Sequence, residues 1–413
     1  MGASSGWATN SALGGSDHRG NPSWVSGGAG LVLDVPPPAS KLAPPGRHPR
    51  YMPERFVSHF IPASWQSRVA FEIRGRRFTL REVVLAAEIR GDLEPLIAES
   101  RKSLACERRA DEEGREADMD AVEELMDGFR YENGLVTVEE TEHWLEENGL
   151  NVDDLGNHFL REYWKRELAR EVDAAVMPDD EESAAWTSDL LISGGLSHLA
   201  RHLAREATCA LQRPGPSESL ARELLDRFRS SDRMRDIPFD RWMAEWQIEE
   251  PAVLSVLFGQ WCHAADRRDA LTSERRAAAL AEQRSALVRV ELVSVQFDSE
   301  AAAQEAYLCV TADGLSLEVV ADESGYPLRQ TSAFVRQLPE EWHLPLLSSI
   351  PGRTLPPLPD SGTYHVCRVV TLHEPVLTDI AVAQALDELL LERHFGRLEA
   401  REVNWLLRTE AAE

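Results

Sequence analysis

The sequence predicts an α+β protein that is mostly α-helical, with tandem helical units, a small β-α-β domain and a long C-terminal helix. Apolar residues recur at helical spacing through most of residues 80–271. Two apolar-rich runs, residues 287–295 and 362–369, are typical of strands, and a helix-like segment begins between them at Asp298. Residues 377–413 return to helical spacing, which predicts an amphipathic helix that docks on another part of the protein.

Residues 1–50 are rich in Gly, Ser, Pro and Ala, and they include the run Pro36-Pro37-Pro38. A segment of this composition cannot bury enough apolar surface to offset the conformational entropy that ordering costs. We therefore expect residues 1–50 to be disordered.

Ordered structure is expected to begin near Trp65 with a hairpin. Residues 69–73 alternate between apolar and polar side chains, as a half-buried strand does. Gly75 supplies a turn, and Phe78 lies on the returning strand.

Helices follow this hairpin. Thr79 and Glu82 have the spacing of a capping box, which predicts that a helix starts directly after Thr79. A second helix is expected from Leu93 to about Arg109, and the Gly-Gly pair at residues 194–195 predicts a break between two later helices.

The helical region repeats itself at a spacing of about 100 residues. The matches pair Cys106 with Cys209, residues 124–130 with 223–229, Trp144 with Trp242, and Trp164 with Trp261. We interpret the region as a duplicated helical unit, first over residues 65–175 and then over 176–285. Its tryptophans either line a groove or pack in the core, and Trp at helical spacing usually packs inward.

The charge of the chain limits the partners that it can bind. With 44 Lys and Arg against 70 Asp and Glu, the formal net charge is −26. Such a surface repels phosphate backbones and anionic headgroups, so neither nucleic acid nor a membrane is expected as a partner. We find no secretory signal pattern and no run of about 18 apolar residues. We therefore expect a cytoplasmic protein.

No motif for a metal, a cofactor or an activated nucleophile is present. The five cysteines lie far apart, without a CxxC or Cys/His cluster. GxSxG, HExxH and Gly-rich phosphate-binding loops are also missing. We therefore expect neither a cofactor nor a metal site.

One segment, residues 129–140, partly matches an EF-hand calcium loop. Its first and third positions carry aromatic residues, where the calcium ion needs carboxylates. A simpler interpretation is that Asn133 and Gly134 turn the chain, and that Thr137 and Glu140 cap the next helix. Calcium binding is therefore not expected.

The most informative motif lies in the domain predicted at residues 286–376. Gly362-Thr-Tyr-His365 places a glycine, an aromatic residue and a histidine at the start of the last strand. This order, after a first strand and a helix, resembles the parvulin-type prolyl isomerase domain. The resemblance makes His365 the candidate catalytic residue. It implies that peptide binding falls to the residues Phe334, Leu338, Trp342 and Tyr364.

Other parts of the parvulin active site are missing. The position of a first histidine in active members is Leu292 here, and that of a later Cys or Asp is Tyr326. Residues 328–332 replace the Gly-rich stretch before the catalytic loop. Prolyl isomerisation has to lower a barrier of roughly 20 kcal/mol. Because the network beneath the pocket has lost members, the resemblance favours a structural role for His365 and a pocket that still holds a peptide.

The resemblance extends upstream over about residues 65–410. A strand, a glycine turn, a capped helix, further helices, a parvulin-like domain and a final helix are similar to the SurA/PpiC class of foldases. Residues 129–135 and 142–145 resemble the helix-turn-helix of their chaperone part. Members of this class are usually exported or anchored to a membrane, and this chain departs from them because no export signal is visible.

We therefore predict a cytoplasmic peptide-binding chaperone with a degenerate parvulin-like domain. Two alternatives stay open: an active parvulin-type prolyl isomerase, and a non-catalytic adaptor that docks partners through its acidic helical face and N-terminal segment. The client implied by family analogy alone is a precursor peptide in the maturation of a modified natural product.

Overall fold

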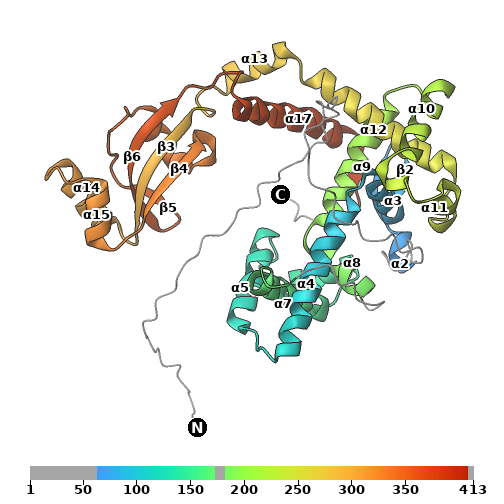
Figure 1. Cartoon of the computed structure of the whole chain (residues 1–413), viewed down its shortest axis with the longest axis horizontal. Helices are drawn as coiled ribbons and strands as arrows, with labels where there is room; N and C mark the ends of the chain where they lie inside the picture. Colours follow the sequence, from blue (N-terminus) through green and yellow to red (C-terminus); the bar gives the residue numbers. More distant parts are fainter. Residues whose placement is uncertain (1–62, 173–181, 408–413) are drawn as a thin grey trace, which may run out of the picture. The chain divides into compact units, whose positions relative to one another are not determined.

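The computed structural model describes residues 63–172 and 182–407 (Figure 1). The segment at residues 1–50, for which we expect disorder, lies outside the described residues. Within the described ranges the chain is mostly helical and carries two small antiparallel sheets. The α+β class predicted from the sequence is therefore confirmed.

The first sheet begins with the hairpin that the sequence predicts. Helix α2 (Ala63–Gln66) precedes strand β1 (Val69–Ile73), which pairs antiparallel with β2 (Arg76–Thr79). Arg74 and Gly75 join the strands with φ angles of 52° and 84°. Two successive left-handed residues give a two-residue loop whose twist matches that of the strands, and glycine adopts this φ without a steric penalty.

The next helix starts at the predicted capping box. In front of α3 (Leu80–Arg90), the Thr79 side chain accepts a hydrogen bond from the Glu82 backbone N–H. The Glu82 carboxylate accepts one from the Thr79 backbone N–H at 2.8 Å. These bonds satisfy N–H groups that a helix leaves unpaired at its start. Helix α4 (Leu93–Glu113) follows, one turn longer than predicted.

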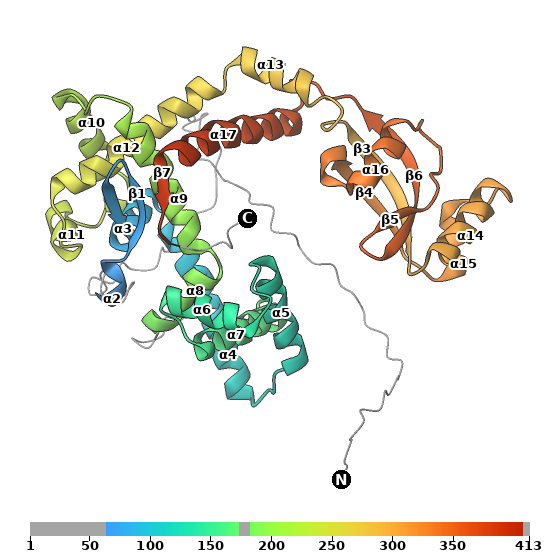
Figure 2. The same cartoon turned by 180° about the vertical axis from the view of Figure 1, so that it is seen from behind.

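The end of the chain differs from the helix predicted over residues 377–413. Helix α17 spans Ile380–Glu402, and the chain then forms strand β7 (Val403–Trp405), which pairs antiparallel with β1. Figure 2 shows β7 beside β1, which completes the sheet order β2-β1-β7. Val403 is β-branched, and the edge of β1 offers backbone partners that another helical turn would leave unused. Pairing with a distant strand therefore overrides the helical pattern.

The helical region continues after α4. Its remaining helices, in chain order, are α5 (Met119–Glu132), α6 (Val138–Asn148), α7 (Val152–Leu168), α8 (Glu182–Ile192), α9 (Gly195–Leu211), α10 (Glu218–Arg229), η1 (Asp232–Met234), α11 (Phe239–Glu245), α12 (Glu250–Ala270) and α13 (Ser273–Glu282). Gly194, with a φ of 74°, makes the predicted break before α9. Asn133 ends α5, and the capping box of Thr137 and Glu140 starts α6, as the simpler interpretation of that segment predicts.

The two halves of the helical region place their matched residues alike. Helix α4 packs on α7 and α9 packs on α12, while α5 packs on α7 and α10 packs on α12. Phe129 and Trp144 meet edge to face with ring centroids 5.5 Å apart, and the matched Phe228 and Trp242 do so at 5.4 Å. The duplicated helical unit stays a prediction. Trp144, Trp164 and Trp242 are buried, so these three belong to the core.

A buried polar network joins α4, α7 and α8. Asp189 on α8 accepts hydrogen bonds from Ser100 at 2.7 Å and Arg161 at 2.6 Å, and it contacts Nδ1 of His158 at 2.8 Å. Burial alone would raise the pKa of Asp189. The bonds and positive charges of His158 and Arg161 outweigh burial, so the pKa lies below its usual value.

The second sheet lies within residues 286–376, for which the sequence predicts a separate domain. Its strands are β3 (Arg289–Phe297), β4 (Leu328–Phe334), β5 (Leu358–Asp360) and β6 (Thr363–His373), and its helices are α14 (Glu300–Thr311), α15 (Leu317–Ser324), η2 (Val335–Gln337) and α16 (Glu340–Leu347). The strand order is β4-β3-β6-β5, and all neighbours are antiparallel. The two predicted strands are β3 and β6, which lie side by side (Figure 1). Strands β4 and β5 are additional to the prediction.

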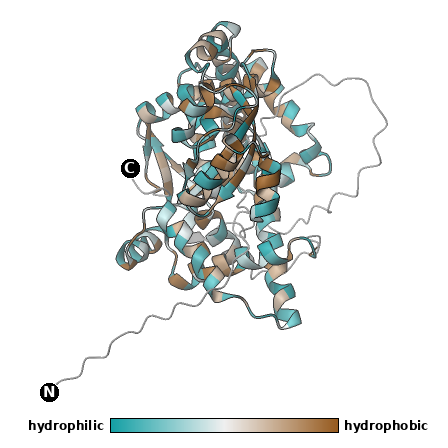
Figure 3. Ribbon diagram, turned by 90° about the vertical axis from the view of Figure 1, so that its left-hand side faces the viewer, coloured by the Kyte–Doolittle hydropathy of each residue, from teal (hydrophilic) through white to brown (hydrophobic). Residues whose placement is uncertain are grey.

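Most helices combine apolar and polar residues. Figure 3 shows hydrophobic and hydrophilic residues intermixed along individual helices, as expected for helices that bury one stripe. In the described ranges we find no helix with the length and hydropathy that crossing a bilayer requires.

We predict that replacing Asp189 by alanine lowers the free energy of unfolding by about 3–5 kcal/mol, because Arg161 is left as a buried charge without its partner. Urea denaturation at pH 7 measures this loss. As a control, Asp313→Ala removes an exposed carboxylate and is expected to change stability by less than about 0.5 kcal/mol.

The loss should depend on pH. A carboxylate with a lowered folded-state pKa stabilises the fold above its unfolded pKa of about 3.9, and this stabilisation disappears as the pH falls below that value. The difference between wild type and Asp189→Ala should therefore shrink below about pH 4. A difference that stays constant from pH 7 to the acid limit would contradict an ionised Asp189.

Candidate functional site

Different helices cover the two faces of the C-terminal sheet. Because side chains alternate along a strand, neighbouring residues of β6 point to opposite faces. Leu292 and Trp342 belong to one apolar cluster with α16, and the ring of His365 contacts Trp342. Tyr326 and Tyr364 pack in a second cluster with α14 and α15. The candidate site is therefore on the first of these faces, which we call the α16 face.

His365 is a buried polar residue on the α16 face. It is 8% exposed, and within the described residues neither Nδ1 nor Nε2 has a hydrogen-bond partner. Its ring meets Trp342 edge to face, with centroids 5.0 Å apart. Leaving a buried polar group unpaired costs about 1–3 kcal/mol of stability. A residue kept at this cost is a candidate for binding a ligand.

Asp360 is the acidic group that acts on His365. Its Oδ2 lies 3.6 Å from Nε2 of His365, just beyond hydrogen-bond length. A two-residue loop holds it there, because Ser361 and Gly362 adopt φ angles of 47° and 87°. Burial lowers the pKa of His365, and the charge of Asp360 only partly offsets this effect. The imidazole is therefore neutral at pH 7 and offers one donor and one acceptor.

The four residues predicted to bind a peptide do not share one pocket. Trp342 and Leu338 pack together on the α16 face, but Tyr364 lies on the opposite face of the sheet. Phe334 is buried against α13 and α17. Only Trp342 and Leu338 therefore share a face with His365. The alternation of side chains along a strand was the signal that could have separated Tyr364 from its neighbour His365.

The positions that match the missing parvulin residues provide no titratable partner for His365. Leu292 is buried among apolar side chains of the α16 face. Tyr326 lies on the opposite face, where its hydroxyl donates to Asp298 at 3.0 Å. Cys367, which sequence reasoning did not single out, follows His365 by two residues on β6. Burial raises the pKa of Cys367 to about 12, so its thiol stays protonated and is no nucleophile.

The described residues offer no preformed metal site either. Nowhere in the described ranges do three His, Cys, Asp or Glu side chains come together as ligands. The α16 face is thus suited to hydrogen bonding and apolar contact with a ligand.

Strand β4 is an open edge of the sheet. It stands at one end of the strand order, five of its seven residues are exposed, and no bulge interrupts its pairing with β3. The opposite edge, β5, has three residues, and one of them is Pro359, which has no N–H. Sequence reasoning missed β4 because both of its faces are exposed, so its side chains show no apolar alternation.

Exposed apolar side chains gather at α16. Leu344 and Ile350 are 77% and 66% exposed, and Leu347 lies between them at 36%. Single exposed apolar residues are common, but three within seven residues of chain suit contact with an apolar partner. We call these three residues the α16 patch.

We predict that His365→Leu raises the free energy of unfolding by about 1 kcal/mol, because leucine fills similar space without two unpaired nitrogens. The gain should increase as the pH falls below about 6.5. A buried histidine with a lowered pKa costs the folded state stability where the unfolded chain is protonated, and leucine removes this cost.

Thermal and urea unfolding at pH 7.5 and 5.5 measure this gain. The matched control is His143→Leu on α6, where the imidazole is exposed and paired with Glu147, and where no stabilisation is expected. A loss of stability in His365→Leu would mean that the buried nitrogens do have partners in solution.

Comparisons with known proteins give structural neighbours only. No family model and no curated protein matches the chain. Solved structures with a similar course include the peptidylprolyl isomerase PrsA from Bacillus cereus, with a TM-score of 0.34 and 10% identity over 55% of this chain and 91% of that one. PrsA from Bacillus anthracis has a TM-score of 0.29 and 8% identity over 49% and 96% of the two chains. The foldase protein PrsA from Streptococcus pneumoniae has a TM-score of 0.24 and 12% identity over 53% and 85%.

Proposed function

We propose that the protein is a peptide-binding, foldase-like chaperone whose C-terminal sheet holds extended peptides without isomerising them. The open edge of β4 is the observation that carries this proposal. An exposed edge strand presents unpaired N–H and C=O groups to another chain, and peptides bind such edges by adding a strand.

The hydrogen bonds of β4 show which of its residues can pair with a peptide. The backbone N–H of Val335 donates to the backbone carbonyl of Val288 at 2.9 Å, so these two residues form a hydrogen-bonded pair. Such pairs alternate along an antiparallel ladder, which means that Thr331 directs its backbone groups toward β3. Gln330 and Ser332 then direct theirs outward. These two residues would bond to the added strand.

Features on the α16 face support peptide binding near this edge. Across the sheet, Arg329 of β4 pairs with Ser294 of β3, and the charge of Arg329 acts on His365. The guanidinium of Arg329, on the edge strand itself, can bond to carbonyl groups of a peptide. The α16 patch adds apolar contact of the kind that chaperones use for unfolded segments.

The same face lacks what isomerisation needs. Trp342 is buried and donates its Nε1–H to the backbone carbonyl of Pro359 at 2.7 Å, so its ring is fixed in the core. Leu292 and the protonated Cys367 offer His365 no network that could act on a twisted amide. This is why we propose binding without turnover.

The client is a proposal from family analogy alone, and the location is a proposal from the sequence. As client we propose a precursor peptide in the maturation of a modified natural product, and as location the cytoplasm.

We predict that Gln330→Pro weakens peptide binding about tenfold or more, because it removes an outward N–H that would pair with the added strand. Fluorescence anisotropy of a labelled peptide of alternating Val and Thr measures the affinity. Gln330→Ala is the matched control, since it removes the same side chain but keeps the N–H. Equal affinities of the two variants would refute binding at the β4 edge.

A protease-coupled assay on a short Ala-Pro peptide separates this proposal from an active isomerase. We expect no acceleration over the spontaneous rate. Turnover that disappears in His365→Ala would establish the isomerase instead. Suppression of the aggregation of an unrelated unfolded protein is expected for a chaperone, and its absence would favour an adaptor.

A further inference from the structure

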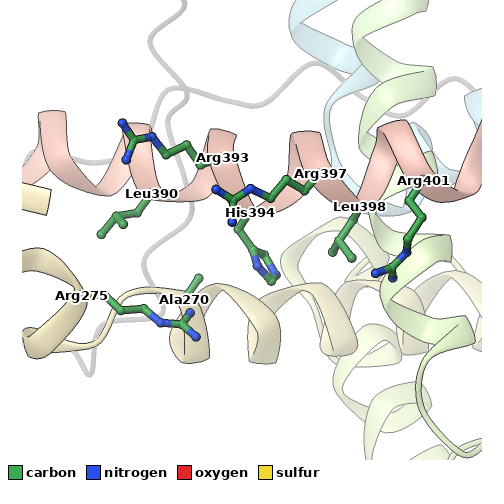
Figure 4. Close-up of a pocket in the computed structure, with 8 residues that line it drawn as sticks. All are labelled: Ala270, Arg275, Leu390, Arg393, His394, Arg397, Leu398 and Arg401. Atoms are coloured by element: carbon green, nitrogen blue, oxygen red, sulfur yellow. The ribbon is translucent and has the colours of Figure 1, made fainter. Parts of the chain in front are cut away.

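An electropositive pocket lies between α17 and the α12–α13 pair (Figure 4). Four arginines and one histidine line it: Arg275, Arg393, Arg397, Arg401 and His394. No carboxylate belongs to the lining, although the chain has 70 Asp and Glu against 44 Lys and Arg. In a protein with a net charge of −26, this local excess of positive charge needs an explanation.

The carboxylates of the described chain neutralise only part of this charge. Arg393 donates two hydrogen bonds to Glu282, at 2.7 and 2.9 Å. Arg401 donates to Glu402 at 2.8 Å, but Glu402 is shared with Arg74.

Two of the arginines have no acidic partner among residues 63–172 and 182–407. Arg275 donates to the backbone carbonyl of Asp269 at 3.0 Å, which leaves its charge unbalanced. Arg397 makes no hydrogen bond or ion pair within the described residues. Two guanidinium groups, one on each wall, are therefore available to an anion.

His394 adds an unpaired polar atom between the two walls. Its Nε2 is buried, and in the described part of the chain it has no hydrogen-bond partner. Figure 4 shows the ring extending from α17 toward the opposite helices, on the same side of α17 as Leu398 and Arg401. The ring also meets Phe395 edge to face at 5.0 Å, which limits its rotation. A ligand between the helices would give Nε2 a partner.

The size and the apolar part of the lining indicate the kind of ligand. Leu390, Leu398 and Ala270 contribute apolar side chains, and the pocket has a volume of about 480 Å³. Sites for small molecules typically measure roughly 300–1,000 Å³ and combine apolar walls with a few polar groups. Planar guanidinium groups match carboxylate and phosphate oxygens with paired hydrogen bonds.

We propose that this pocket binds a small organic oxyanion, a carboxylate or a phosphate ester that carries an apolar group. Arg275 and Arg397 bind the oxyanion from opposite walls, Nε2 of His394 donates or accepts a further bond, and Leu390 and Leu398 contact the apolar group. The contacts are partly solvated, so the affinity is modest and decreases with added salt.

Isothermal titration calorimetry of the full chain at low salt tests this proposal. The probes are phenyl phosphate and benzoate, which differ in the anionic group. Inorganic phosphate lacks the apolar group and is the control for it. Benzyl alcohol lacks the charge and is the control for the charge. We expect one or both aryl anions to bind more tightly than inorganic phosphate, and benzyl alcohol not to bind. The tighter of the two aryl anions identifies the anionic group.

Variants make the result specific to the pocket. Arg275→Gln and Arg397→Gln should each weaken binding of the better probe about tenfold. The control is Arg222→Gln on α10, which removes the same charge from an exposed pair with Glu218. Arg275 and Arg397 are exposed, so both variants should keep the melting temperature of the wild type.

Three results would overturn the proposal. The first is that neither aryl anion binds, and the second is that Arg222→Gln weakens binding as much as the pocket variants do. The third is tighter binding of a short polyglutamate peptide, which would assign the pocket to an acidic polypeptide.

Discussion

The pairing of β7 with β1 is the constraint on which the arrangement of this chain depends. It connects the end of the described chain to the first strand, and it fixes where α17 ends. Between these two strands the chain forms the helical region and then the C-terminal sheet. Helices α13 and α17, which lead into and out of that sheet, are linked by two paired contacts, Arg276 with Asp387 and Arg393 with Glu282. The sheet domain is thus an insertion within a region whose two ends meet.

The two candidate sites of the protein share one physical property. Each contains a buried histidine nitrogen that has no hydrogen-bond partner in the described parts of the chain. One belongs to His365, which contacts Trp342, and the other to His394, between α17 and the α12–α13 pair. Protein interiors usually pair such groups, because an unpaired one reduces stability. Each site also has exposed groups that suit a ligand: the edge of β4 belongs to the same sheet as His365, and guanidinium groups line the pocket of His394. The sites differ in chemistry, since one suits a backbone and the other an anion.

Local signals in the sequence were the ones that predicted structure correctly. The capping boxes at Thr79 and Thr137 and the helix break at Gly194 depend on residues within one turn of each other. The features that sequence reasoning missed, β4 and β7, depend on partners far away in the chain. The first five residues of β4 are exposed on both faces and β7 follows a helical pattern, so no apolar alternation marks either as a strand.

The candidate site shows the same limit. His365 stood out by its motif, but its contact with Asp360 depends on the register in which Leu358 opposes His365. A register is a property of two strands, and one sequence does not give it. The placement of Tyr364 on the opposite face was accessible in principle, because it requires only the alternation of side chains.

The closure of the first sheet also sets an order of events during synthesis. Arg74 and Glu402, which form an ion pair beside β1 and β7, are 328 residues apart in the chain. As the ribosome proceeds from the N-terminus, β1 and β2 emerge long before β7 exists to cover the free edge of β1. For most of translation that edge is open to pairing with another nascent chain. A protein that we propose to be a chaperone is therefore, while it is being made, a candidate client for one.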